Sequence, residues 1–147
     1  FMRDWRTNEV KFIDLRTIDV MAAAHNLLGS NEPYMLLSGY RSPKTNNMLR
    51  SRSKGVAKNS LHMKGQAADL RLKSRSVKQI SRAAETCSAG GVGHYYGSNF
   101  VHMDCGPMRT WAADRQTVPD NRKRRPLGRL RNTLTLSAYI SQPKRTK

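Results

Sequence analysis

The chain has 147 residues, of which 27 are Lys or Arg and 10 are Asp or Glu, so its net charge is +17 and its pI is near 10.8. This length fits one domain with a hydrophobic core of its own. No apolar run approaches the roughly 18 residues of a membrane-spanning helix. Two cysteines are too few for a disulfide-dense scaffold or a four-thiolate zinc site. The strong positive charge favours an anionic polymer as partner: nucleic acid, a membrane surface or an acidic cell-wall polymer.

The charge is unevenly distributed along the chain. Residues 1–111 hold 17 basic and 8 acidic residues, whereas residues 112–147 hold 10 and 2, so the last quarter carries almost half of the net charge. We therefore predict a domain over 1–111 and a basic C-terminal extension over 112–147, partly disordered, with one short strand at 134–140. Basic tails bind polyanions loosely, so no specific nucleic acid is expected as partner. The first residues lack the apolar segment and cleavage site of a signal peptide.

The first half of the chain predicts helix, strand and helix in that order. Apolar residues at helical spacing indicate a helix over 14–28, which Gly29 ends. A short apolar strand is expected over 34–37. Ser42 as N-cap and Pro43 as first helical residue indicate a second helix, reaching about residue 52. The face of the first helix expected to be buried consists of Leu15, Ile18, Met21, Ala22, His25 and Leu28.

The second half predicts a strand, a helix and a hairpin. The strand is expected over 67–72 and the helix over 77–88, where Cys87 completes an apolar stripe. Residues 92–96 and 100–104 flank a turn and predict the hairpin. This order of elements indicates an α+β domain with a small, mostly antiparallel sheet and helices packed on one side of it.

Three residues carry metal-binding chemistry. His62 and Asp69 offer an imidazole nitrogen and a carboxylate oxygen, and Gly65 lets the chain turn between them. His102 is the third candidate, because strand alternation puts it on one face with Asp104. Three ligands would leave the fourth position of zinc for water, as in catalytic zinc sites. On spacing alone, a chance scatter of His and Asp residues remains the alternative.

The segment 60–69 follows the pattern Ser-x-His-x-x-Gly-x-Ala-x-Asp of the zinc D-Ala-D-Ala peptidases, which share their fold with the hedgehog signalling domain. Further segments over about 2–111 resemble the YcbK-like murein endopeptidases, namely 3–9, 38–46, 55–58, 90–93 and 100–104. The resemblance implies a hedgehog/DD-peptidase-like fold and one Zn²⁺ ion held by His62, Asp69 and His102. It also implies peptidoglycan peptide stems as substrate, with a preference for cross-links that involve meso-diaminopimelate, and a periplasmic or otherwise extracytoplasmic location.

By the same resemblance, Arg41 faces the substrate, where a guanidinium would bind a carboxylate or stabilise an oxyanion. Without the resemblance, a solvated charge would be the favoured interpretation of Arg41. The D-Ala-D-Ala dipeptidases use a Glu shortly before the third ligand as general base, whereas Asn99 stands three residues before His102 here. We expect Asp104 to be either the general base or a partner that orients His102 or the water. A shifted register, with Asp104 on the metal in place of His102, stays open.

The sequence therefore predicts a zinc peptidase that hydrolyses peptide cross-links of peptidoglycan, with metal-activated water as nucleophile. The sequence does not give the oligomeric state, and a monomer is assumed. The alternatives are a D-Ala-D-Ala carboxypeptidase, an inactive zinc-stabilised cell-wall-binding domain and a basic nucleic-acid-binding protein. His94 is expected on the cleft wall or the surface. Cys87 and Cys105 would be able to pair in an exported protein, although spacing does not establish the geometry.

Overall fold

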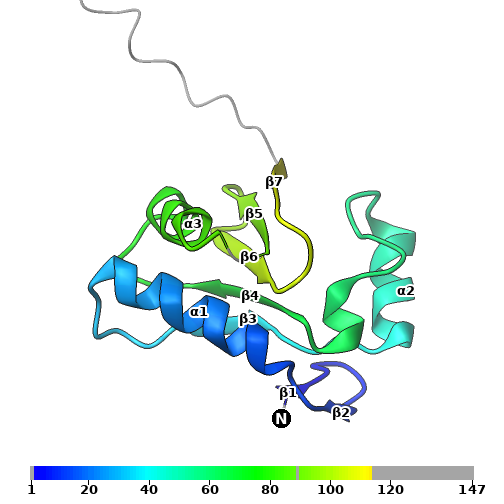
Figure 1. The fold of residues 1–147 in the computed structure, drawn as a ribbon. Helices are drawn as coiled ribbons and strands as arrows, with labels where there is room; N and C mark the ends of the chain where they lie inside the picture. The colour runs from blue at the N-terminus through cyan, green and yellow to red at the C-terminus, as the bar shows by residue number, and fades with distance from the viewer. Residues whose placement is uncertain (1, 89, 114–147) are drawn as a thin grey trace, which may run out of the picture. The chain divides into compact units, whose positions relative to one another are not determined.

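The structure is a computed structural model that describes residues 2–88 and 90–113. These residues form a five-stranded sheet, a separate two-stranded sheet, three α-helices and a short 3-10 helix (Figure 1). The α+β class predicted from the sequence is confirmed. The strand predicted over 134–140 lies outside the described residues.

The five-stranded sheet has the order β3-β4-β6-β5-β7. Its strands are β3 (Met35–Ser38), β4 (Ala67–Arg71), β5 (Gly91–Tyr95), β6 (Phe100–Asp104) and β7 (Arg109–Ala113). The neighbouring strands pair antiparallel, except that β7 pairs parallel with β5. The predicted hairpin is the β5–β6 pair. Strand β7 was not predicted, and it continues two residues past position 111. A small hairpin of β1 (Met2–Arg3) and β2 (Val10–Lys11) precedes the main sheet.

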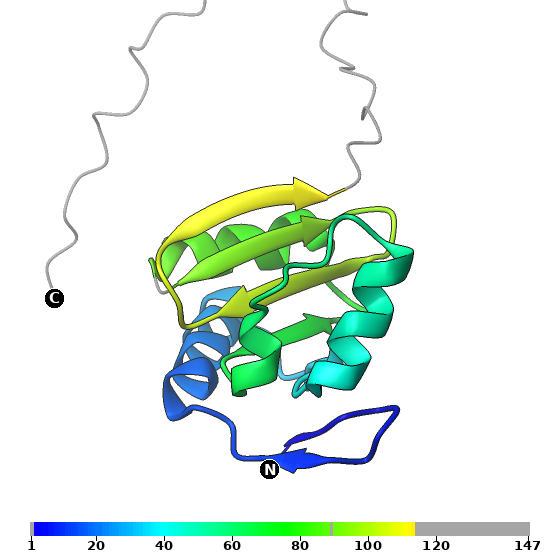
Figure 2. The ribbon, with the colours of Figure 1, turned by 90° about the vertical axis from the view of Figure 1, so that its right-hand side faces the viewer.

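The helices cover both faces of the sheet. Helices α1 (Leu15–Leu28) and α3 (Val77–Thr86) contact each other and pack on one face (Figure 1). Helix α2 (Pro43–Arg52) and the 3-10 helix η1 (Leu61–Lys64) lie on the opposite face (Figure 2). The expectation that all helices lie on one side is therefore wrong for α2. None of the described helices is long and apolar enough to cross a membrane.

Helix α2 begins where the sequence predicts. The Ser42 side chain accepts a hydrogen bond from the Thr45 amide, and Pro43 occupies the first turn, where its missing N–H costs nothing. Helix α3 begins with a capping box, in which Ser76 and Gln79 satisfy each other's amides. These caps fix where both helices start relative to the strands that precede them.

The core lies between the sheet and the α1–α3 layer, and its most buried large side chains are Leu70, Ile80, Val101 and Met103. Helix α1 faces this core through Thr17, Val20 and Ala24. The predicted face was partly wrong, since Leu15 is 76% exposed and Ile18 is 40% exposed. Apolar residues occupy more than one side of this helix, so their spacing alone did not identify the buried side.

The remaining predicted core residues of α1 have mixed positions. Met21 and Leu28 pack against the core, and Ala22 is exposed. His25 is half-buried, with Nε2 2.7 Å from the Glu32 carbonyl oxygen and its ring edge-to-face with another aromatic ring, that of Tyr34. Both cysteines, Cys87 and Cys105, are free and pack against the edge of the core.

Candidate metal centre

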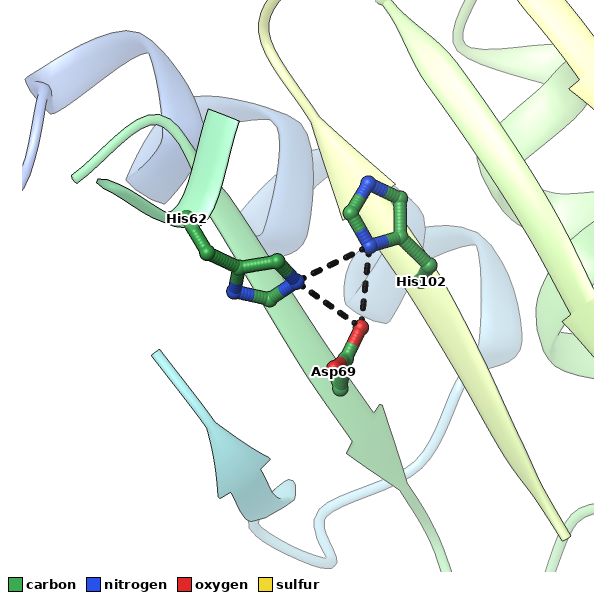
Figure 3. A group of neighbouring side chains, drawn as sticks. All are labelled: His62, Asp69 and His102. Carbon is green, nitrogen blue, oxygen red and sulfur yellow. Dashed lines mark hydrogen bonds and ion pairs between the residues drawn. The ribbon is translucent and has the colours of Figure 1, made fainter. Parts of the chain in front are cut away.

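His62, Asp69 and His102 converge at one point on the face of the sheet that α2 partly covers (Figure 3). They come from η1, β4 and β6, and Asp69 pairs directly with His102 across the β4–β6 ladder. Asp69 Oδ1 lies 3.2 Å from His62 Nε2 and 2.9 Å from His102 Nδ1, and the two nitrogens are 3.2 Å apart. All three residues are buried, so the cluster has the donors and the spacing of a three-ligand metal site.

Local backbone geometry brings His62 to this point. Helix η1 is a single 3-10 turn that ends at Gly65, whose φ is 70°. A Cβ at Gly65 would lie 2.4 Å from the Phe12 carbonyl oxygen, so both the left-handed conformation and the close backbone approach require glycine. The chain then enters β4 and returns Asp69 to the same face as His62.

Hydrogen bonds to the outer nitrogens set the orientation of both rings. His62 Nδ1 lies 2.7 Å from the Gly39 carbonyl oxygen, and because a carbonyl only accepts, Nδ1–H is the donor. His102 Nε2 lies 2.9 Å from Asp104 Oδ2 and donates to that carboxylate. When the two imidazoles are neutral, the nitrogens that face Asp69 therefore carry lone pairs, which is the arrangement that metal-ligating histidines have.

The electrostatics of the cluster favour a cation. Burial by itself would raise the pKa of Asp69, but the charge and hydrogen bonds of His62 and His102 outweigh it and hold that pKa well below its usual range. Burial would lower the pKa of His102, yet hydrogen bonds to Asp104 and Asp69 raise it overall. Ionised carboxylates on two sides of His102 therefore stabilise positive charge at this point.

Asp104 lies on the far side of the His102 ring from the cluster. It is 0% exposed, and burial would raise its pKa, but hydrogen bonds from His102 and from the Gly106 and Gly91 amides lower it to about 2. The Arg109 guanidinium completes its partners, with Nη2 2.6 Å from Oδ2 and Nη1 3.2 Å from Oδ1. Of the two residues that the sequence left open for the third ligand, His102 is the one in the cluster.

Arg41 and His94, the two other candidates from the sequence, lie in different places. Arg41 Nη2 is 3.4 Å from Asp69 Oδ2, so its guanidinium borders the cluster. Its Nε is buried and has no hydrogen-bond partner among the described residues. His94 is outside the cluster, and its Nε2 lies 2.6 Å from Glu85 Oε1 at the surface.

A cleft of about 660 Å³ opens over the cluster. Helix α2 and the loop after it form one wall, and strands β5, β6 and β7 form the other. The residues that line it are Arg41, Leu49, Ser53, Gly55, Val56, Ala57, Ser60, His62, Asp69, Tyr95, Ser98, Phe100, His102, Arg109, Trp111 and Ala113. A cleft of this size has room for a small ligand beside the three candidate metal ligands.

Comparison with known proteins gives the family. The family model described as Peptidoglycan L,D-endopeptidase MepK matches residues 1–111. The chain belongs to this family. It is similar to the peptidoglycan L,D-endopeptidase MepK of Escherichia coli (strain K12), with 50% identity over 111 residues, 76% of this chain and 61% of the relative. The probable peptidoglycan L,D-endopeptidase MepK of Haemophilus influenzae is 44% identical over 111 residues, 75% of this chain and 60% of the relative. The chain thus spans about three fifths of these relatives' length. No solved structure matches it.

The sequence predicts the family resemblance, but it did not identify the cleft residues on β5 and β7. Arg109 and Trp111 lie on β7, and Tyr95 lies at the end of β5. The signal available was weak: Arg109 and Trp111 are two residues apart, so they share a face if the segment is a strand. Nothing local indicated that this segment would pair with β5.

Proposed function

We propose that this chain is a zinc-dependent peptidase that hydrolyses peptide cross-links of peptidoglycan. The observation that carries the proposal is the convergence of His62, Asp69 and His102 at the floor of an open cleft, with both imidazole lone pairs turned toward the carboxylate. The curated relatives are named L,D-endopeptidases, which favours L,D-type cross-links over a terminal D-Ala as the bond cleaved.

The donor set fits zinc. Two imidazole nitrogens and one carboxylate oxygen are borderline ligands that suit Zn²⁺, and the remaining side of the cluster faces the cleft. When bound, the ion would lower the pKa of a water molecule to about 7 and polarise the scissile carbonyl. His62 and His102 hold their orientation through Gly39 and Asp104, so little rearrangement is needed to bind the ion.

Arg41 is proposed to act on the substrate. Its guanidinium is largely buried beside Asp69 and lines the cleft, and its Nε has no described partner. A fixed, partly unsatisfied guanidinium binds a stem-peptide carboxylate or stabilises the oxyanion that develops at the scissile carbonyl. Arg41→Lys keeps the charge without the fork, so it is expected to lower kcat/KM while zinc content stays at one per chain.

Asp104 is proposed to orient His102 rather than to take the proton of the nucleophile. Its oxygens are occupied by His102, two backbone amides and Arg109, and it does not line the cleft. In the orienting role, Asp104→Asn lowers zinc affinity by about 10- to 100-fold, and added zinc restores part of the activity. In the general-base role, zinc affinity holds while kcat collapses, so equilibrium zinc titration beside kcat separates the two.

The basic surface of the chain suits the proposed substrate. Residues 41–82 hold twelve basic residues and one acidic residue, Asp69, and peptidoglycan stems carry carboxylates. Long-range attraction would raise the local concentration of the enzyme on the wall without defining the bond cleaved. Because peptidoglycan lies outside the cytoplasmic membrane, the proposed place of action is the periplasm or another extracytoplasmic compartment.

The test is release of soluble muropeptides from purified peptidoglycan sacculi. Zinc-loaded protein is expected to release them, a chelator to stop the release, and added zinc to restore it. Mass spectrometry of the products identifies the bond cleaved and separates an endopeptidase from a carboxypeptidase, which would release free D-Ala. Binding to sacculi without any release would refute the enzymatic proposal.

One observation favours a second candidate, a zinc-stabilised domain that binds the cell wall without cutting it. Asp69 is the only carboxylate among the described residues that line the cleft, and Asn99 stands where related dipeptidases have their general base. Such a domain would bind sacculi and stoichiometric zinc, and removal of zinc would lower its melting temperature with no product formed in any sample.

A further inference from the structure

Strand β7 is one strand removed from His102, yet its side chains reach the centre of the site. The sheet order places β5 between β6 and β7. Gly93 on β5 pairs with His102 on one side and with Trp111 on the other, so these three residues form one row across the sheet. Two residues earlier on β5, Gly91 pairs with Arg109, and the Gly91 amide donates to Asp104 Oδ1.

Gly91 and Gly93 leave space above β5, because neither has a side chain. A Cβ at Gly91 would lie 2.5 Å from Asp104 Oδ2 and 2.8 Å from Arg109 Cζ. A Cβ at Gly93 would lie 2.6 Å from Trp111 Cζ2. Neither glycine has a positive φ, so the backbone itself would accept another residue. Their missing side chains are what allows Arg109 and Trp111 to extend across β5 to the residues of β6.

Arg109 fixes the carboxylate that fixes His102. Its two terminal nitrogens form a fork on Asp104, and Nη1 also donates to the Pro107 carbonyl at 3.0 Å. Asp104 Oδ2 is shared between Arg109 and the Nε2–H of His102. A bidentate guanidinium holds a carboxylate in one plane, so the acceptor presented to the imidazole has one orientation.

Trp111 restrains the ring from its side. The indole and the His102 ring have centroids 5.1 Å apart at 53°, and the indole N–H donates to the Tyr95 hydroxyl at 3.3 Å. The Arg109 guanidinium lies 5.1 Å from the indole centroid, so the two β7 side chains also support each other. His102 is thus held at its Nε2 by Asp104 and by the tilted ring contact with Trp111.

We propose that Arg109 and Trp111 are positioning residues, which set the orientation of His102 and thereby the affinity and geometry of the metal site. This inference rests on the proposed function, because it assumes that His62, Asp69 and His102 hold the ion. It gives β7 a role in metal binding although β7 carries none of the candidate ligands. This edge strand supports the third ligand, His102, across the intervening strand β5.

The experiment measures zinc affinity by competition with a chromophoric chelator, and ligand geometry by the visible d–d spectrum after Co²⁺ replaces zinc. Arg109→Met removes the fork and keeps the length of the side chain, while Trp111→Leu removes the ring. Both are expected to weaken zinc binding by about 10- to 100-fold and to shift the cobalt spectrum. Arg109→Lys restores the charge without the fork and is expected to be intermediate.

Arg16→Gln is the matched control, because Arg16 forms a comparable ion pair with Asp14 at the surface, away from the cleft. It is expected to bind zinc as the unsubstituted chain does. Thermal unfolding of the metal-free proteins separates lost stability from lost positioning, since a merely structural role would lower the melting temperature and leave the cobalt spectrum of the folded protein unchanged. Asp104 keeps two amide donors in Arg109→Met, which favours folding of that variant.

Should Trp111→Leu not fold, Gly93→Ala tests the contact between the indole and the His102 ring, because a Cβ at Gly93 would lie 2.6 Å from Trp111 Cζ2 and push the indole aside without replacing Trp111. Should Arg109→Met not fold, Arg109→Lys tests the fork on Asp104. A loss of affinity with an altered cobalt spectrum supports the inference. Unchanged affinity and spectrum in the folded variants overturn it and leave the proposed function intact. If the unsubstituted chain binds no zinc, the proposed function itself is wrong.

Discussion

Two buried carboxylates of this fold, Asp4 and Asp69, have different kinds of partner. Asp69 faces ionisable side chains, namely those of His62, His102 and Arg41. Within residues 2–88 and 90–113, Asp4 accepts from neutral groups, the amides of Arg6, Thr7 and Ser42 and the Thr45 hydroxyl. Backbone amides can only donate hydrogen bonds to Asp4, whereas the imidazole nitrogens beside Asp69 can also bind a cation through their lone pairs. Burial alone therefore does not mark a functional carboxylate, and the chemistry of its partners does.

Removing a candidate metal ligand is expected to have the largest effect on zinc binding and activity. His62→Ala or His102→Ala is expected to abolish stoichiometric zinc and to lower muropeptide release by more than about 100-fold, because losing a ligand exceeds the usual cost of losing its supporting partner. Metal analysis of the purified proteins and release from sacculi measure the two effects. His94→Ala is the control, since His94 lies outside the cluster. Full zinc content in the two ligand variants would refute the site.

Replacing Asp4 or Asp69 singly by Asn distinguishes a carboxylate that stabilises the fold from one that binds metal. Asp4→Asn is expected to lower the free energy of unfolding by about 2–3 kcal/mol, because the new amide N–H₂ meets donors where the carboxylate had accepted from them. Zinc affinity should stay as it was. Asp69→Asn is expected to do the reverse, with zinc affinity reduced by more than about 100-fold. Urea unfolding of the metal-free proteins and zinc titration give the two quantities, and parallel losses in both variants would contradict the distinction.

The pH dependence of the unfolding free energy tests whether the negative charge on Asp4 stabilises the fold. Burial acts to raise its pKa, but the amides of Thr7, Ser42 and Arg6 and the Thr45 hydroxyl bring it well below its ordinary range. The folded pKa is thus lower than the unfolded one of about 3.9. Ionised Asp4 therefore stabilises the fold above about pH 4, and this contribution is lost as the pH falls from there toward the folded pKa.

Urea unfolding of the unsubstituted chain and of Asp4→Asn at a series of pH values tests this. The difference in unfolding free energy between them is expected to be constant above about pH 6 and to shrink as the pH is lowered to about 3. A difference that stays constant over this range would show that the charge on Asp4 contributes nothing to folding.

Much of the candidate site could be predicted from local pattern. The spacing of His62, Gly65 and Asp69 encodes a turn that returns the chain to one face, and alternation in β6 puts His102 on the matching face. Alternation also puts Asp104 on that face, but it does not tell which of the two side chains reaches the metal. The choice depends on Gly91, Gly106 and Arg109, which surround Asp104 only after β5 and β7 have paired.

Other parts of the fold depend on contacts that no local pattern carries. Strand β7 pairs parallel with β5. Gly106 and Pro107 mark a turn before its segment, but the segment has no run of β-branched residues, and a turn does not tell which strand becomes the partner. Helix α1 has apolar residues on several sides, and its packing against α3 and the sheet selects the narrow side with Thr17, Val20 and Ala24. Small residues let these layers approach closely, which a count of large apolar residues does not detect.

The smallest expected effect comes from one neutral donor of the Asp4 group. The Thr45 hydroxyl donates to Asp4 Oδ1 at 3.0 Å, and Thr45 lies in the first turn of α2, the helix that borders the cleft. Thr45→Val keeps the shape and removes this donor, while the three amides still satisfy the carboxylate, so unfolding free energy should fall by about 1 kcal/mol. Urea unfolding measures the loss, and Ser51→Ala, an exposed change at the other end of α2, is the control. Because α2 carries no candidate ligand, zinc affinity of Thr45→Val should equal that of the unsubstituted chain; a joint loss of stability and affinity would mean that the two buried regions act as one.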